Sequence, residues 1–292
     1  MFDTILVPVD GSRGSSAAVE HAVTLGQFQG ATIHALSVLD SEALDVVALE
    51  TNDTETIRTE LERRGRAANA SAAERATSAG LDAVRDLRVG DPYRTIRSVA
   101  REIDADLLVM GTRGRTALDS IRLGSTTERV VTAVDTPILA VPPHSTNDES
   151  HADSITYDRL VVPVDGSDVS ERAADIALDF AEIVDASVDV IYVVDRTITD
   201  IEDAPRSIVG LLKEGGRRAV ETVSAEATTR GIRARTGVQR GVPAEEILEY
   251  ATSVDGSLIA MGTRGRGDTS DRLLGSTTAR VLRRTDFPVL VS

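Results

Sequence analysis

Apolar and polar residues alternate along the chain in blocks that predict strands followed by amphipathic helices. The apolar run Ile5–Val9 predicts a buried strand. Residues Ser15–Gln29 then predict a helix, with Ala18, Ala22 and Leu25 at helical spacing. Strands this apolar are covered on both faces, which is typical of a parallel sheet between two layers of helices.

The alternation continues through the first half of the chain. It predicts strands over 31–40, 82–90, 106–110 and 137–141, and helices over 55–78, 92–103 and 126–134. This order predicts an α/β fold with a doubly wound, five-stranded parallel sheet, whose crossovers are right-handed. Ligands of such sheets bind beyond the carboxyl ends of the strands.

The whole pattern occurs twice, so the sequence predicts two tandem domains of this kind. The matching segments are TILVPVDGS (4–12) with RLVVPVDGS (159–167), VGDPYRTI (89–96) with RGVPAEEI (240–247), and ADLLVMGTRGR (105–115) with GSLIAMGTRGR (256–266). The stretch between the copies is polar and contains prolines that disfavour helix. The predicted division is domain 1 over 1–142, a linker over 143–156 and domain 2 over 157–292.

Composition narrows the class of protein. The 292 residues suffice for two domains, and there are no cysteines, so disulfides and cysteine-bound zinc are excluded. With 41% hydrophobic but only 3% aromatic residues, the core is expected to be aliphatic. No apolar run approaches the length of a membrane span, so we expect a cytoplasmic protein without membrane contact.

The charge is strongly acidic, at −15 net, and Lys213 is the only lysine among the 32 basic residues. Such a field disfavours binding to nucleic acid through its phosphates. An acidic, lysine-poor surface that keeps arginine is typical of proteins from salt-loving microbes, in which salt screens the self-repulsion. We therefore interpret the protein as halophilic; an acidic protein of an ordinary cell is the alternative.

Each copy carries a glycine and hydroxyl frame after its fourth strand. The matching residues are Gly111, Gly114, Gly124 and Ser125 in the first copy, and Gly262, Gly265, Gly275 and Ser276 in the second. Glycine lets the backbone approach a ligand closely, and the GSTT run opens a helix whose free N–H groups favour an anion. The alternative is that these residues only form tight turns and cap a helix. The frame is kept in both copies while the residues inside it differ, which favours phosphate binding.

Other nucleotide motifs and catalytic arrangements are missing from the sequence. There is no G-x-x-x-x-G-K-[ST] and no G-x-G-x-x-G after a first strand. The four histidines, His21, His34, His144 and His151, do not recur between the copies, so no Ser-His-Asp arrangement is predicted. The chain therefore has a predicted phosphate cradle, which is the glycine and hydroxyl frame of each copy, but no predicted catalytic base.

The spacing G-x2-G-x9-G-[ST] after a strand ending in Met-Gly, together with VPVDGS at the first strand, resembles the universal stress protein family. The resemblance is to its ATP-binding branch in the tandem two-domain form, and it covers nearly the whole chain except the linker. It implies five-stranded domains of the Rossmann-like, adenine nucleotide alpha hydrolase-like type. It also implies one adenine nucleotide per domain at the point where the strand order reverses.

Carried over by position, the family's site residues fall on both copies. In the first copy they are Pro8 beside the pocket, Asp10 at the adenosine, the backbone of Val38 at the adenine edge, Met110 and Gly111 at the ribose, and Gly114, Gly124, Ser125, Thr126 and Thr127 at the phosphates. In the second copy they are Pro163, Asp165, Val193, Met261 and Gly262, followed by Gly265, Gly275, Ser276, Thr277 and Thr278. Mg²⁺ would enter through the phosphates of ATP, with no metal ligand from the protein.

Two pairs of site residues have open alternatives. Arg113 and Arg264 sit between the first two glycines and either reach a phosphate or are solvated loop residues. Asp10 and Asp165 precede glycine and either contact the ligand or only form the turn.

Two functions from different classes follow. The first is an ATP-binding regulatory module of the stress response, with AMP or ADP as alternative ligands. The second is a slow ATPase or an autophosphorylating protein that uses Ser125 or Ser276, which the missing base disfavours. Because two copies are fused, the two domains can pair within one chain as a pseudo-symmetric internal dimer. We also expect that two chains can pair into a homodimer. No motif identifies a protein partner.

Overall fold

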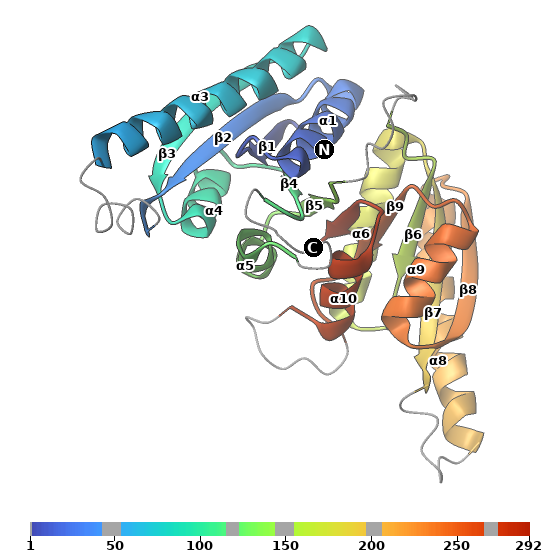
Figure 1. The fold of residues 1–292 in the computed structure, drawn as a ribbon. Helices are drawn as coiled ribbons and strands as arrows, with labels where there is room; N and C mark the ends of the chain where they lie inside the picture. Colours follow the sequence, from blue (N-terminus) through green and yellow to red (C-terminus); the bar gives the residue numbers. More distant parts are fainter. Residues whose placement is uncertain (1, 43–53, 115–122, 144–154, 197–205, 266–273) are drawn as a thin grey trace. The chain divides into compact units, whose positions relative to one another are not determined.

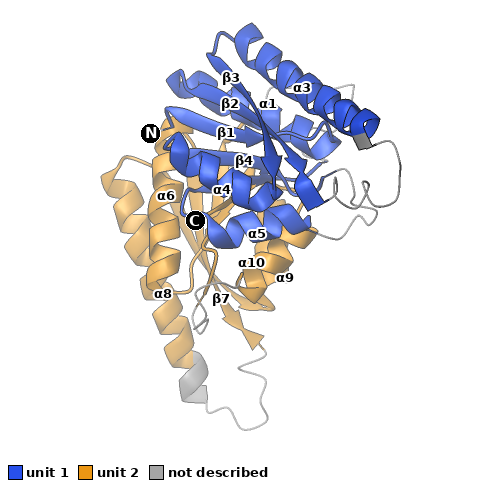
Figure 2. Ribbon diagram, turned by 90° about the vertical axis from the view of Figure 1, so that its left-hand side faces the viewer, with its two compact units in different colours: residues 1–155 blue, residues 156–292 orange. Residues whose placement is uncertain are grey.

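The computed structural model divides the chain into two compact units, residues 1–155 and residues 156–292 (Figure 2). The residues that it describes are 2–42, 54–114, 123–143, 155–196, 206–265 and 274–292. Residues 144–154 of the expected linker lie outside this set, so the domain boundaries given above stay a prediction. Each unit has its own five strands and its own helices.

The first unit is an α/β domain whose elements follow in the predicted order. They are β1 (Thr4–Pro8), α1 (Arg13–Gln29), β2 (Thr32–Asp40), α3 (Thr54–Ser78), β3 (Ala83–Gly90), α4 (Pro92–Glu102), β4 (Leu107–Gly111), α5 (Ser125–Ala133) and β5 (Ile138–Val141). The sheet has the order β3-β2-β1-β4-β5, and its paired strands run parallel. Helices α1 and α3 cover one face, and α4 and α5 cover the other (Figure 1).

The second unit repeats this architecture. Its elements are β6 (Arg159–Pro163), α6 (Asp168–Val184), β7 (Ser187–Asp195), α8 (Arg206–Thr229), β8 (Ala234–Gly241), α9 (Pro243–Ser253), β9 (Leu258–Met261), α10 (Ser276–Arg284) and β10 (Val289–Val291). The strand order is β10-β9-β6-β7-β8, again parallel. The predicted doubly wound, five-stranded fold is confirmed in both units, and the order of strands reverses beside β1 and β6.

The core is aliphatic, as the composition predicts. Ile5, Leu6 and Leu107 are fully buried in the first unit, and Leu160 and Leu258 are fully buried in the second. Central strands with no exposed side chain need helices on both faces, which the fold supplies. One aromatic pair contributes to the second core, where the rings of Tyr157 and Phe180 meet edge to face with centroids 5.2 Å apart.

Two helices begin slightly earlier than predicted, and a side-chain cap accounts for the first of them. The predicted helix Ser15–Gln29 begins at Arg13 instead, since the Ser12 hydroxyl accepts a hydrogen bond from the Ser15 N–H at 3.1 Å. A capping residue precedes the helix, so Ser15 already belongs to its first turn. Helix α5 likewise begins at Ser125 rather than Thr126.

Long helices in the described part of the chain are polar on their outer side. Helix α3 has 25 residues, and Glu60 pairs along it with Arg63 and Arg64. None of the described helices combines the length and the apolarity that crossing a bilayer requires. The cytoplasmic location stays a prediction.

His21 is an ionisable side chain buried on α1, with 2% of its surface exposed. Burial lowers its pKa from 6.5 to about 4. The fold therefore holds the neutral imidazole, because a charge there would lose its hydration. As the pH falls below 6.5, the unfolded chain binds a proton at His21 before the folded chain does, so the free energy of unfolding decreases.

We expect His21→Leu to reduce the loss of stability between pH 7 and pH 5. Over this interval the lowered pKa costs the wild-type protein about 2 kcal/mol, and leucine cannot be protonated. Urea unfolding of both proteins at the two pH values measures the effect. For each protein, the free energy of unfolding at pH 7 is subtracted from that at pH 5, so that any difference in packing caused by the substitution cancels. Equal losses in the two proteins would contradict a neutral His21 in the fold.

Candidate functional site

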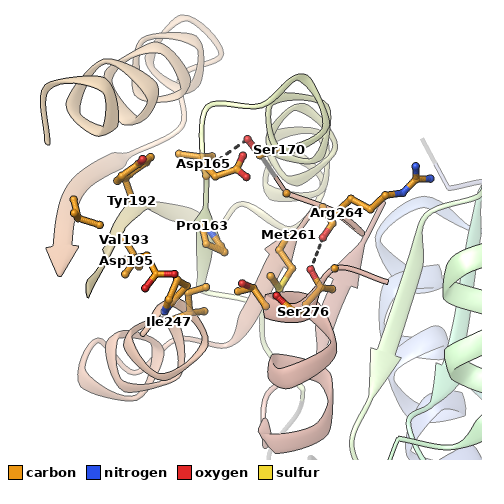
Figure 3. Close-up of a pocket in the computed structure, with 18 of the residues that line it drawn as sticks. Pro163, Asp165, Ser170, Tyr192, Val193, Asp195, Ile247, Met261, Arg264 and Ser276 are labelled. Atoms are coloured by element: carbon orange, nitrogen blue, oxygen red, sulfur yellow. Dashed lines mark hydrogen bonds between the residues drawn. The ribbon is translucent and has the colours of Figure 1, made fainter. Parts of the chain in front are cut away.

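The second unit contains a pocket of about 500 Å³ at the carboxyl ends of β6, β7 and β9 (Figure 3). Every residue predicted for the second copy lies in its wall: Pro163, Asp165, Val193, Met261, Gly262, Arg264, Gly265, Gly275, Ser276, Thr277 and Thr278. Residues far apart in the sequence meet here because parallel strands end at the same edge of the sheet. What these residues bind stays a prediction.

The wall also contains residues that the sequence patterns did not assign. They are Val164, Ser170, Tyr192, Val194, Asp195, Leu212, Pro243 and Ile247. Pro243 and Ile247 belong to the repeated segment 240–247, so the duplication itself could have pointed to them. The duplication carries no such indication for Tyr192, because serine stands at that position of the first copy.

The pocket has an apolar end and a polar end. Val193 of β7 and Ile247 of α9 lie at the first end, together with the carboxylate of Asp195 (Figure 3), and Leu212 of α8 also lines the pocket. The loop after β9 and the first turn of α10 form the second end, which is rich in backbone N–H groups. Strand β6 lies between β7 and β9, so Asp165 at its end stands between the two (Figure 3).

Asp165 joins two loops of the site. Its Oδ1 accepts hydrogen bonds from the Ser167 N–H at 3.0 Å and the Ser167 hydroxyl at 2.6 Å, which fixes the turn after β6. Its Oδ2 lies against the glycine loop, where a Cβ on Gly265 would come within 2.8 Å of it. Gly166 in the turn has a φ of 74°, a conformation that favours glycine.

The first unit repeats this junction. Asp10 Oδ1 accepts a hydrogen bond from the Ser12 N–H at 2.9 Å, and a Cβ on Gly114 would lie 3.0 Å from Asp10 Oδ2. The turn-forming function of both aspartates is thus visible in the structure. Contact of their carboxylates with a ligand stays a prediction.

The helices that begin with the GSTT runs have no side-chain cap. Gly124 and Gly275 are the N-cap residues of α5 and α10, and neither helix has a side-chain hydrogen bond at its start. Helices α1 and α6, by contrast, are capped by Ser12 and Ser167. The first N–H groups of a helix have no acceptor within the helix, so these two N-termini present donors and a positive dipole end to an anion.

The glycine caps are themselves fixed by the preceding loop. The Gly124 N–H donates to the Thr112 carbonyl oxygen at 2.8 Å, and the Gly275 N–H donates to the Thr263 carbonyl oxygen at 2.9 Å. A Cβ on Gly124 would lie 3.2 Å from that Thr112 oxygen. Each helix start is therefore held against the loop that follows β4 or β9.

Three hydroxyl residues follow each glycine cap, and they differ in exposure. Ser125 and Ser276 are exposed, while Thr126 and Thr277 are half-buried. Thr127 and Thr278, which were expected at the phosphates, are buried. The hydroxyl of Thr127 donates to the Gly111 carbonyl oxygen at 2.9 Å. The hydroxyl of Thr278 donates to the Gly262 carbonyl oxygen at 2.7 Å. Their side chains thus tie the helix to the end of the strand, and only their backbone N–H groups remain for a phosphate.

The remaining residues predicted for the first unit lie at the same positions as their counterparts. Pro8 ends β1, Val38 lies near the end of β2, and Met110 and Gly111 end β4. A Cβ on Gly111 would lie 2.6 Å from the carbonyl carbon of Gly14 on α1, so helix and loop backbones touch there.

Arg264 lies in the pocket wall, but its side chain extends away from Asp165 and Met261 (Figure 3). This direction favours the loop interpretation over a phosphate contact. Arg113 occupies the matching turn of the first unit and is half-buried.

Comparison with known proteins identifies relatives along the entire chain. The model of the universal stress protein family matches residues 1–142 and 156–292. A universal stress protein of Methanocaldococcus jannaschii is 41% identical over 138 residues, which cover 46% of this chain and 81% of that protein. A universal stress protein of Mycolicibacterium smegmatis is 26% identical over 300 residues. This alignment covers 98% of this chain and 96% of that protein.

A solved structure supports the same fold. The crystal structure of a universal stress protein from Archaeoglobus fulgidus superimposes with a TM-score of 0.71. The alignment covers 100% of this chain and 98% of that one, at 23% sequence identity. At 23% sequence identity, this structural similarity is evidence for the fold alone.

We expect Thr278→Val to destabilise the second unit by about 1 to 3 kcal/mol, because valine keeps the shape but leaves the Gly262 carbonyl without its donor. Thr277→Val is the matched control, since Thr277 is half-buried in the pocket wall. Urea unfolding followed by circular dichroism measures both variants. Equal stability of the two variants would show that the Thr278 hydroxyl does not hold the helix.

Proposed function

Because the chain belongs to the universal stress protein family, we propose that each unit binds one adenine nucleotide. The ligand is ATP, with ADP and AMP as alternatives, and Mg²⁺ enters through the phosphates. The protein then acts as a nucleotide-dependent regulatory module of the stress response. The observation that carries the proposal is the second unit's pocket, which joins an apolar end to an uncapped helix N-terminus.

The polar end of the pocket suits a chain of phosphates. Gly262 and Gly265 contribute backbone without side chains to the pocket wall, and Gly275 precedes α10 without a side-chain cap. Backbone N–H groups in such a loop and at a helix N-terminus bind anionic oxygens, and the exposed Ser276 and half-buried Thr277 add hydroxyl donors. The phosphates also carry their own Mg²⁺, which the protein need not ligate.

The middle and the apolar end suit an adenosine. Asp165 stands between the two ends, where its carboxylate can accept hydrogen bonds from ribose hydroxyls. Met261 and Val193 both line the pocket. In the proposal Met261 contacts the ribose and the backbone of Val193 contacts the adenine edge. Ile247 and Leu212 supply apolar surface for the base.

The first unit contains the same elements of a site. The Asp10 carboxylate meets the Gly114 loop, and Gly124 starts α5 without a side-chain cap. Pro8, Val38 and the Met110–Gly111 strand end hold the remaining positions. A second nucleotide is therefore proposed there, so that a full chain takes up two.

We expect calorimetric titration of Mg-ATP, in concentrated KCl, to give saturable binding near two nucleotides per chain. The double variant Gly124→Val, Gly275→Val places a branched side chain at both helix starts and should lose this binding. Both glycines have negative φ values that valine adopts, −62° and −58°, and the Cβ at Gly124 would press on the Thr112 carbonyl oxygen of the adjoining loop, so the change acts at the helix start.

Circular dichroism of the double variant checks that it remains folded. Binding near one per chain in the wild type would assign a nucleotide to a single unit. A folded wild-type protein that carries no nucleotide through purification and binds none would refute the proposal, and the repeated frame would then serve only as turn and cap.

A further inference from the structure

The pocket wall of the second unit contains a tyrosine on its second strand, and the matching residue of the first unit is a serine. Tyr192 of β7 lies in the wall of the second unit's pocket, and Ser37 of β2 holds the corresponding position of the first unit. We infer that the two nucleotide sites are unequal: Tyr192 contacts the nucleobase in the second unit, and the first unit has no such contact. This inference rests on the proposed function.

The Tyr192 ring is held in a fixed place. Tyr192 is only 8% exposed, yet it lines the pocket (Figure 3). The backbone of Gly216 on α8 supports the ring closely, since a Cβ there would come within 2.7 Å of the Tyr192 Cγ and 2.8 Å of its Cε1. A ring fixed by a helix on one side gives the ligand a preorganised apolar surface on the other.

Ser37, at the matching position of the first unit, is buried and hydrogen-bonded to the backbone. It is 2% exposed, and its hydroxyl lies 2.9 Å from the Val9 carbonyl oxygen and 3.0 Å from the Gly65 carbonyl oxygen. Gly65 occupies the place on α3 that Gly216 occupies on α8. The hydroxyl therefore bonds strand and helix backbones inside the first unit, and the small side chain adds no ring surface.

The position of Tyr192 in the pocket points to the base rather than to the phosphates. The wall also contains Val193, Val194 and Asp195 of the same strand and Leu212 of α8, and Asp195 is the one charged residue among these four. The glycine loop and the start of α10 follow β9, which is separated from β7 by β6. Stacking or edge contact with an aromatic ring strengthens the binding of a base by about tenfold and is independent of the phosphates.

The test isolates one site at a time. Gly124→Val removes the first cradle, so the second site is titrated alone, and Tyr192→Ser is then added to give the second site the residue of the first. We expect the affinity for Mg-ATP to fall about tenfold, and Tyr192→Phe to keep it within about twofold because the ring remains. The affinity for magnesium tripolyphosphate, which has no base, should stay unchanged in both variants.

A second readout follows the ring directly. The chain has four tyrosines and no tryptophan, so tyrosine emission can be observed without interference. Mg-ATP should change this emission in the Gly124→Val protein, and Tyr192→Phe should remove most of the change while binding persists. Tyr192→Ser combined with Gly275→Val is the control, in which the first site should bind as in Gly275→Val alone.

The outcomes separate the inference from the proposed function. An unchanged Mg-ATP affinity in Tyr192→Ser would overturn the inference and leave nucleotide binding intact. A loss that Tyr192→Phe does not rescue, or that tripolyphosphate shares, would also overturn it, because Tyr192 would then act only on the shape of the pocket. No Mg-ATP binding by the wild-type chain would refute the proposed function on which the inference rests.

Discussion

In each unit a glycine after the fourth strand lies directly against the aspartate carboxylate of the turn after the first strand. A Cβ on Gly114 would lie 3.0 Å from Asp10 Oδ2, and one on Gly265 would lie 2.8 Å from Asp165 Oδ2. The carboxylate cannot turn away without loss, since the other oxygen of Asp165 holds the turn through Ser167. The residues that directly follow β4 or β9 thus lie against this turn, and the Thr112 and Thr263 carbonyl oxygens among them accept the N–H groups of Gly124 and Gly275, which precede α5 and α10.

Much of this arrangement could be predicted from the sequence because it depends on local pattern and on repetition. Buried strands such as Leu107–Gly111 are apolar throughout, and parallel strands bring their carboxyl ends to one edge without further information. The repeated glycine frame then identified the loops at that edge. Helix ends such as Arg13 were less predictable, because a cap depends on which hydroxyl reaches which N–H.

What the sequence could not predict is the partner that each hydroxyl or ring finds. Thr277 and Thr278 are identical in type and adjacent, yet one lies half-buried in the pocket wall and the other bonds the Gly262 carbonyl. That difference follows from the helix turning by about 100° per residue once α10 has begun at a fixed place. The contrast between Tyr192 and Ser37 is similar, because only the packing of α8 and α3 decides whether that position faces a pocket or the backbone.

A net charge of −15 repels an anionic ligand at a distance, so the proposed binding of phosphates would depend on short-range contacts. The N–H groups and the dipole at a helix start act within the first turn, where Gly124 and Gly275 leave them without a side-chain cap. Salt separates the two effects, since at 1 M the Debye length is about 3 Å. Repulsion from distant carboxylates is then screened while donors at hydrogen-bond distance still act. In the concentrated salt predicted from the acidic, lysine-poor composition, the net charge would not oppose the proposed binding of phosphates.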